Sequence, residues 1–245
     1  GGKAPGSIAV TTDIFQEGLI VPGVKFLKRG EIDRDMLKWF TANVRGKKES
    51  AGDLRAQVAS NKLGTRRMVE LLDRFGLDVV NTVIEQLYRY TERRVRHEFK
   101  RFPDGVFEGD AYVDDDGVSD KPIYIKAKVI IAKGEVTIDL EGSDPQRRSP
   151  MNSTYAQTYS AVAFPIRALL PSDIPTNDGF YRMVRVTAPK GTVVNCEYPS
   201  AVVGGWEVGQ KTAEAVLRAL SKAMPDRVPA ESKKTILHIA FGGVD

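Results

Sequence analysis

The sequence predicts an α+β fold in which a long antiparallel helical hairpin packs with a mainly antiparallel sheet and further helices. Apolar residues recur three or four positions apart over residues 33–102, which is typical of helices. From Gly105 they alternate with polar residues instead, which is typical of half-buried strands. This change of period predicts two segments, residues 1–103 and residues 104–245, which we expect to be parts of one larger subunit.

The first segment begins with Gly- and Pro-rich loops and β-branched runs at residues 8–12 and 20–27, which predict short strands. A helix follows over residues 33–44, with Asp33 as its cap and Gly46 at its end. Two long helices are predicted over residues 50–75 and 78–102, and Gly76 is the predicted C-cap of the first. The short turn between them favours an antiparallel hairpin.

The second segment begins with three predicted antiparallel strands, at residues 106–113, 123–131 and 136–140. Their turns are residues 114–117 and 133–134. The acidic turn at 114–117 lacks the spaced ligands and distal Glu of a calcium loop, so we interpret it as a plain turn. Four further elements are predicted after these strands. They are a helix over 153–170, a strand over 181–187 opened by Arg182, a helix over 212–223 and a strand over 235–241 that contains His238.

The composition is that of a globular protein, with 42% hydrophobic and 28% charged residues. No apolar run approaches the roughly 18 residues needed to cross a bilayer, so no membrane partner is expected. A single cysteine, Cys196, excludes an internal disulfide and favours a reducing, cytoplasmic setting. Neither histidine is near Cys196 in the sequence, which favours a buried structural thiol over a nucleophile.

The net charge of +4 would weakly favour anionic partners. The basic residues cluster in residues 89–101, however, where Glu92 and Glu98 interrupt them and no nucleic-acid motif accompanies them. We therefore expect no nucleic-acid partner and interpret this stretch, with His97, as a solvated helix face. A subunit contact and an anion site are the alternatives.

The most unusual segment is GDLRAQVASN, residues 52–61. In a helix, Asp53, Gln57 and Asn61 lie four residues apart and share one face, beside a stripe of small residues. An ordinary surface helix would instead carry Lys and Glu opposite a wide apolar stripe. This polar row, Asp53, Gln57 and Asn61, either bonds to neighbouring backbone inside an assembly or lines a cavity. The spacing alone favours bonding to backbone.

Three loop residues are further candidates. Glu17 lies in a glycine-containing loop, where its carboxylate either faces a ligand or accepts backbone N–H bonds. Asp144 and Asn152 lie at the two ends of a turn before a predicted helix. The backbone N–H groups of such a turn can point at an anion or a carbonyl group. The alternative is a capped turn that binds no ligand. The chain offers no Ser/His/Asp set, zinc spacing or phosphate loop.

The decapeptide at 52–61 closely resembles a motif of the hydantoinase B/oxoprolinase family. This family comprises the metal-site subunits of ATP-dependent cyclic amidohydrolases and related acetone and acetophenone carboxylases. Further segments follow the family's order: residues 1–7, 12–18, 22, 139–146, 152, 175–179, 189–192, 195, 199–203 and 241–243. Residues 204–210 correspond to a family segment Gly-Asn-x-Glu-Thr-x-Gln, in which Glu207 and Gln210 match while Gly205 and Gly209 depart. Members of that family are longer, so this chain is expected to be their central part.

The resemblance implies a hetero-oligomer in which a hydantoinase A-type subunit uses ATP with Mg²⁺. It also implies a divalent metal, Mn or Zn, held by His and Asp residues upstream of Gly1, so no metal ligand is expected in this chain. The candidates here would line the substrate cavity or orient the metal's ligands. They are Asp53, Gln57, Asn61, Glu17, Asp144 and Asn152.

The leading hypothesis is therefore the B-type subunit of an ATP-dependent cyclic amidohydrolase that opens a hydantoin, 5-oxoproline or lactam ring. Such rings are unreactive at neutral pH, and phosphorylation supplies an activated oxygen leaving group while a metal polarises the carbonyl or activates water. The first alternative is a subunit of an ATP-dependent, biotin-independent ketone carboxylase of the acetone or acetophenone type. The second is a noncatalytic structural subunit that holds an ATP-using partner.

Overall fold

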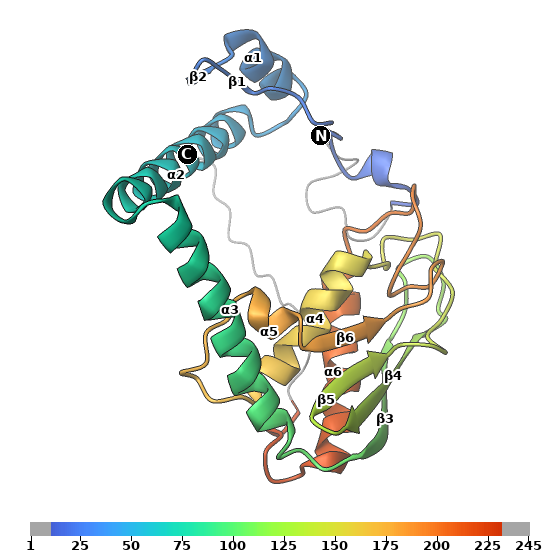
Figure 1. Cartoon of the computed structure of the whole chain (residues 1–245). Helices are drawn as coiled ribbons and strands as arrows, with labels where there is room; N and C mark the ends of the chain where they lie inside the picture. Colours follow the sequence, from blue (N-terminus) through green and yellow to red (C-terminus); the bar gives the residue numbers. More distant parts are fainter. Residues whose placement is uncertain (1–10, 232–245) are drawn as a thin grey trace. The chain divides into compact units, whose positions relative to one another are not determined.

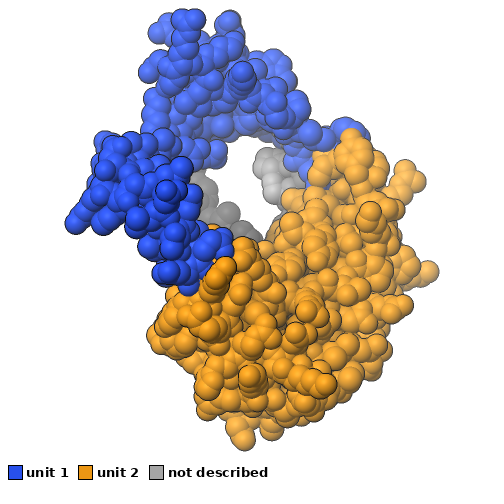
Figure 2. Space-filling model, viewed as in Figure 1, with its two compact units in different colours: residues 1–6, 15–87 blue, residues 7–14, 88–245 orange. Residues whose placement is uncertain are grey.

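The computed structural model describes residues 11–231 and confirms the α+β class (Figure 1). The chain separates into two compact units (Figure 2). Unit 1 comprises residues 1–6 and 15–87, and unit 2 comprises residues 7–14 and 88–245. The division falls inside helix α3 (Leu77–Phe99), and the predicted boundary near Pro103 lies just after that helix.

Unit 1 contains the short strands β1 (Leu27–Lys28) and β2 (Glu31–Ile32) and the helices α1 (Arg34–Ala42) and α2 (Lys47–Phe75). The cap of α1 is confirmed, because the Asp33 carboxylate accepts hydrogen bonds from the backbone N–H groups of Asp35, at 2.9 Å, and Met36, at 3.2 Å. Gly46 does not end α1 but precedes α2. A 3-10 helix, η1 (Ile14–Gln16), lies where the units meet in the sequence.

The strand predicted over residues 20–27 is wrong apart from its last residue. Ile20, Val21 and Val24 lie in an irregular segment and are 42–47% exposed. A β-branched run forms a strand only where a neighbouring strand and a core face are available, and the described part of this unit provides neither for these residues. The strand predicted at 8–12 lies largely outside the described residues.

The junction between α2 and α3 differs from the expected hairpin. Gly76 ends α2 as predicted, with a φ of 77° and its N–H donating to the Leu72 carbonyl at 2.8 Å. The antiparallel packing of α2 on α3 is not formed in the described residues, because apolar side chains on both helices, such as Phe75 and Val83, stay 47% exposed. Packed helical hairpins use loops of about two to five residues. A single glycine is too short to bring the two helices side by side.

Within the described residues, unit 2 is built on a four-stranded sheet in the order β3-β4-β5-β6. Its strands are β3 (Gly105–Val113), β4 (Ile123–Ala132), β5 (Glu135–Asp139) and β6 (Val184–Thr187). The first three are antiparallel, as predicted, and β6 runs parallel to β5. Lys133 and Gly134 join β4 to β5 with φ values of 51° and 75°, the backbone that a two-residue hairpin turn requires.

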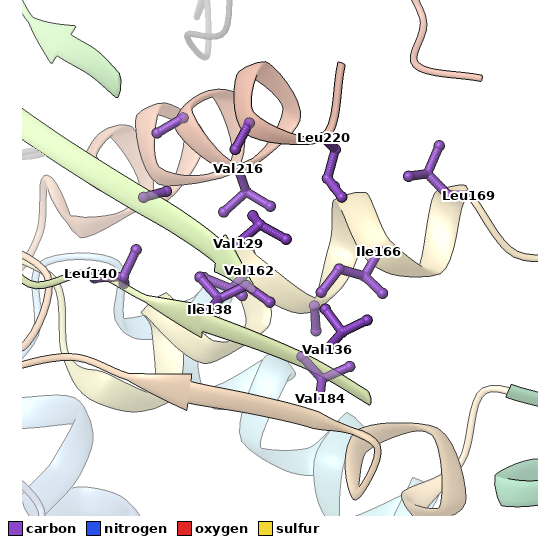
Figure 3. Close-up of a cluster of buried hydrophobic side chains, with 14 of the residues drawn as sticks. Val129, Val136, Ile138, Leu140, Val162, Ile166, Leu169, Val184, Val216 and Leu220 are labelled. Carbon is purple, nitrogen blue, oxygen red and sulfur yellow. The ribbon is translucent and has the colours of Figure 1, made fainter. Parts of the chain in front are cut away.

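Helices α4 (Tyr155–Ala168) and α6 (Gly205–Ala223) cover one face of this sheet, and α5 (Asp178–Tyr181) is a single turn before β6 (Figure 1). Alternate residues of β4 and β5 are fully buried under these helices, whereas the residues between them are partly exposed. Figure 3 shows the resulting core, in which side chains from the sheet and both helices point toward one another. Its labelled members are Val129, Val136, Ile138, Leu140, Val162, Ile166, Leu169, Val184, Val216 and Leu220.

Two predicted element starts in unit 2 are wrong. Helix α6 begins at Gly205, seven residues before the predicted start at residue 212. The glycines that favoured a loop there serve close packing instead, since a Cβ on Gly205 would lie 2.7 Å from the Asn152 carbonyl oxygen. Arg182 does not open a strand but ends α5, where it pairs with Asp178 at 2.7 Å.

Candidate functional site

Two segments that the sequence singles out, residues 141–153 and 189–205, lie side by side in unit 2. Backbone hydrogen bonds join them directly: Gln146 N–H donates to the Gly191 carbonyl at 2.9 Å, and Val193 N–H donates to the Asp144 carbonyl at 2.9 Å. Ser153 N–H donates to the Val193 carbonyl at 2.7 Å. Family-like segments about fifty residues apart in sequence thus form one loop cluster beside the sheet.

Asp144 is anchored within this loop cluster. One carboxylate oxygen, Oδ2, accepts hydrogen bonds from the backbone N–H of Tyr124 at 3.1 Å and from the Arg147 guanidinium at 2.7 Å. The same guanidinium donates to the Pro122 carbonyl at 3.1 Å. Asp144 therefore ties the loop to the start of β4, and its side chain remains 28% exposed.

Asn152 is fully buried, and both ends of its amide are bonded. Its Oδ1 accepts from the Arg147 N–H at 2.7 Å. Its Nδ2 donates to the carbonyls of Arg147, Ser149 and Ala201 at 2.9, 2.8 and 3.0 Å. Arg147 thus bonds to both Asp144 and Asn152. The hydrogen bonds of Asn152 hold the loop at residues 147–149 against Ala201, which is a structural role.

The same region includes the acidic turn at 114–117, which is internally bonded. Burial alone would raise the pKa of Asp116. The N–H groups of Ser119, at 2.6 Å, and Val118, at 2.9 Å, donate to its carboxylate, and with the nearby charge of Arg147 they hold its pKa below the ordinary value. These bonds fit the plain turn that we predicted.

The family-like segment at 175–179 also has a structural explanation. Asn177 donates from Nδ2 to the Thr91 hydroxyl at 3.0 Å and accepts from the Gly179 N–H at 2.9 Å. A Cβ on Gly179 would overlap the Tyr88 carbonyl oxygen, so only glycine allows α5 to approach α3 this closely. Arg182 adds an ion pair to Glu92 at 3.4 Å.

The row on α2 has different surroundings. Asp53, Gln57 and Asn61 are all exposed, and their side chains form no hydrogen bond or ion pair within residues 11–231. Any hydrogen-bond or ion-pair partner of these side chains therefore lies outside the described residues. Glu17 is half-buried and belongs to unit 1, as the row does, whereas Asp144 and Asn152 belong to unit 2.

Sequence reasoning missed a groove between α4 and α6, because it placed Gln210 before a helix. The groove has a volume of about 330 Å³ and is bounded by the aromatic rings of Phe164 and Trp206. Two amide side chains, Gln157 and Gln210, also line it. Its floor is made of the small residues Ala161, Gly209 and Ala213. An apolar concavity with a few amide groups has the composition of a small-molecule site, and Gln210 is one of the family-like residues.

A second depression lies at the loop cluster and is lined by Lys190, Asn195, Cys196, Glu197 and Tyr198. Cys196 is half-buried there, so it is less buried than the structural thiol that we predicted. The prediction rested on the absence of a histidine near Cys196 in the sequence, which does not determine burial. His97 is exposed, as predicted, and His238 lies outside the described residues.

Between residues 11 and 231, no three His, Cys, Asp or Glu side chains converge as a metal site would require. No helix in this part of the chain has the length and apolar character needed to cross a membrane.

Comparisons with known proteins confirm the resemblance. The model of the hydantoinase B/oxoprolinase family matches residues 1–245. The beta subunit of caprolactamase from Pseudomonas jessenii is 34% identical over 233 residues, which cover 94% of this chain and 40% of that protein. The B-type subunit of a putative D-/L-hydantoinase from Pseudomonas sp. (strain NS671) is 30% identical over 256 residues, covering 99% of this chain and 43% of that protein.

Solved structures agree. The crystal structure of the ATP-dependent caprolactamase from Pseudomonas jessenii matches with a TM-score of 0.84 and 31% identity, over 93% of this chain and 40% of that chain. A nucleotide-free acetone carboxylase matches with a TM-score of 0.83 over 93% of this chain and 32% of that chain, but at 20% identity it shows the fold alone. This chain spans less than half the length of these relatives. On sequence and structure together, it belongs to the hydantoinase B/oxoprolinase family.

Proposed function

We propose that this chain is part of the B-type subunit of an ATP-dependent cyclic amidohydrolase, which opens a lactam, hydantoin or 5-oxoproline ring together with an ATP-using A-type subunit. One observation carries the proposal. The likeness to the caprolactamase beta subunit extends over 94% of the chain at 34% identity. At this identity the likeness supports a related reaction as well as a common fold, which the acetone carboxylase likeness does not.

The residues of this chain would position groups in that reaction. Asp53, Gln57 and Asn61 present a carboxylate and two amides from a rigid helix and have no partner in the described residues, so they are available to line a cavity that other parts of the assembly complete. Asp144 and Asn152 would act indirectly, by fixing the loop cluster. Glu17 is a further candidate for the cavity wall.

The reaction as proposed also needs groups that this chain does not supply. ATP with Mg²⁺ would be used by the partner subunit to phosphorylate the carbonyl oxygen of the cyclic amide. A divalent metal, Mn or Zn, would polarise the carbonyl or activate water. As the family resemblance implies, its His and Asp ligands would lie upstream of Gly1 in the full-length protein.

The test uses the full-length parent protein with whatever subunit co-purifies with it. ATP-dependent ring opening of caprolactam, hydantoin or 5-oxoproline is measured by mass spectrometry, and carboxylation of acetone or acetophenone is measured in parallel with labelled bicarbonate. We expect ring opening without bicarbonate, and loss of activity on removal of a divalent metal. Carboxylation alone would replace the proposal with a ketone carboxylase. An assembly active in neither assay would support a noncatalytic subunit.

A further inference from the structure

Unit 1 contains a groove with an unusual concentration of positive charge. Helices α1 and α2 meet near Leu37 and Ala51, and the open groove beside this contact has a volume of about 460 Å³. Residues three, four and seven positions apart on α1 face it, as do residues four positions apart on α2. Among the described residues, five cationic side chains and no carboxylate line it: Arg34, Lys38, Lys47, Lys48 and Arg55. We call these five residues and the apolar floor between them the basic groove.

None of the five cations forms an ion pair within residues 11–231. Further along the same helix, by contrast, Lys62 lies 4.0 Å from Glu31 and Arg67 lies 2.8 Å from Glu70. Lys47 and Lys48 also lie in the first turn of α2, where the helix dipole disfavours positive charge. Unpaired like charges gathered in one groove repel one another, and a bound anionic group would offset that repulsion.

The floor of the basic groove restricts the kind of anion. Leu37, Ala51, the Thr41 methyl group and the aliphatic stems of the Lys and Arg side chains make it apolar. A free phosphate would leave this floor uncovered. A single-stranded nucleic acid would lack a stacking partner, because no aromatic ring among the described residues lines the groove. A polypeptide helix with apolar residues on one side and flanking carboxylates complements both the floor and the cations.

We propose that the basic groove docks an acidic amphipathic helix of the partner subunit. The proposal rests on the proposed function only in requiring such a subunit. Asp53, the first residue of the polar row, is two positions from Ala51 and so lies about 200° around the helix from the groove floor. Docking in the groove therefore leaves that side of α2 open.

The first test is photo-cross-linking in the full-length protein purified with its accompanying subunit. A benzophenone amino acid replaces Thr41 at the groove floor, and the cross-linked peptides are sequenced. We expect a cross-link to a Glu- or Asp-rich segment of the accompanying subunit. A cross-link to this chain itself, to a second copy of it, to nucleic acid or to a segment without carboxylates would overturn the proposal.

The second test reverses charge. Combining Lys38→Glu, Lys47→Glu and Lys48→Glu should raise the dissociation constant of the subunit complex at least tenfold at low salt and flatten its salt dependence. The matched control makes the same charge change outside the groove, with Lys62→Glu, Arg66→Glu and Arg67→Glu. It should alter the dissociation constant of the subunit complex less than about threefold. Equal effects of the two triple variants would contradict specific docking.

The outcomes separate this proposal from the proposed function. If a subunit accompanies the wild-type protein and the assembly opens rings, but the cross-link lies elsewhere, only the docking proposal fails. If no subunit accompanies the wild-type protein, the proposed assembly and the docking proposal fail together.

Discussion

Asn152 and Asn61 are both family-like amides, yet they have opposite surroundings. Asn152 is fully buried in unit 2 and bonds to four backbone groups. Asn61 is exposed on α2, and its side chain has no partner in the described residues. A buried amide bonded at both ends is explained by the fold alone. The contacts within residues 11–231 do not explain an exposed amide in a row of polar groups.

Glycines in unit 2 and on α2 show the same contrast between a residue required by packing and one with open surroundings. A Cβ on Gly109 in β3 would overlap the carbonyl oxygen of Ala215 in α6, whereas a Cβ on Gly52 in α2 would meet nothing within 4 Å. Gly109 is therefore required by packing inside unit 2. Gly52 has no such role in the described residues, although it begins the most family-like segment of the chain.

The largest expected effect comes from Gly109→Ala. The added methyl group would also lie 2.5 Å from the Ala219 nitrogen, and backbone atoms of a packed helix cannot rotate away. We expect a loss of about 4 kcal/mol in the free energy of unfolding, measured by urea denaturation of the full-length protein. The control, Gly52→Ala, should leave stability unchanged or raise it by up to about 1 kcal/mol. A loss below about 1 kcal/mol for Gly109→Ala would show that α6 does not approach β3 this closely.

Asn152→Ala should cost about 3 kcal/mol in the same measurement. The substitution leaves the Arg147 N–H and the Ala201 carbonyl without their bonds inside a buried loop cluster. Asn61→Ala removes an amide of the same size and should change stability by less than about 0.5 kcal/mol. If the two variants were equally stable, the contrast between the loop cluster and α2 would be lost.

The exposed row should matter for turnover rather than for stability. Asp53→Ala and Asn61→Ala, each made in the full assembly, should reduce ring-opening turnover by about a hundredfold, or about 2.7 kcal/mol. Urea denaturation of the same samples checks that stability is retained. Unchanged turnover would instead assign the row to helix packing and support the noncatalytic alternative.

The sequence predicted the elements that local signals specify. The Asp33 cap, the Gly76 end of α2 and the Lys133–Gly134 turn each depend on a few neighbouring residues, and all three are confirmed. The start of α6 was missed because Gly205 reads locally as a loop residue. Its role depends on Asn152, which is far away in the sequence. The hairpin prediction was wrong because Gly76 is the only residue between α2 and α3, and a one-residue connection is too short to bring the helices side by side.

For the candidate site, as for the fold, the sequence indicated which segments matter but not how distant residues pack. The sequence marked residues 139–146, 152, 189–192, 195 and 199–203 only as family-like segments, and the structure shows that they lie side by side. Side-chain roles were not predictable, because burial decides them. Asp144 and Asp53 are both carboxylates in family-like motifs, but within the described residues only Asp144 pairs with an arginine.

The smallest expected effect concerns Asp116. Its carboxylate has a pKa below the ordinary value in the folded protein because the Ser119 and Val118 N–H groups donate to it. A lowered folded-state pKa contributes stability above the unfolded-state pKa of about 3.9, and that contribution disappears as the pH falls through the folded-state value. Asp116→Asn should therefore cost about 1 kcal/mol at pH 7 and progressively less below about pH 4. Urea denaturation across this range, with Asp120→Asn as a surface-charge control, measures the difference. A cost that stayed constant with pH would show that the amide bonds of this turn, rather than its charge, stabilise the loop beside Arg147.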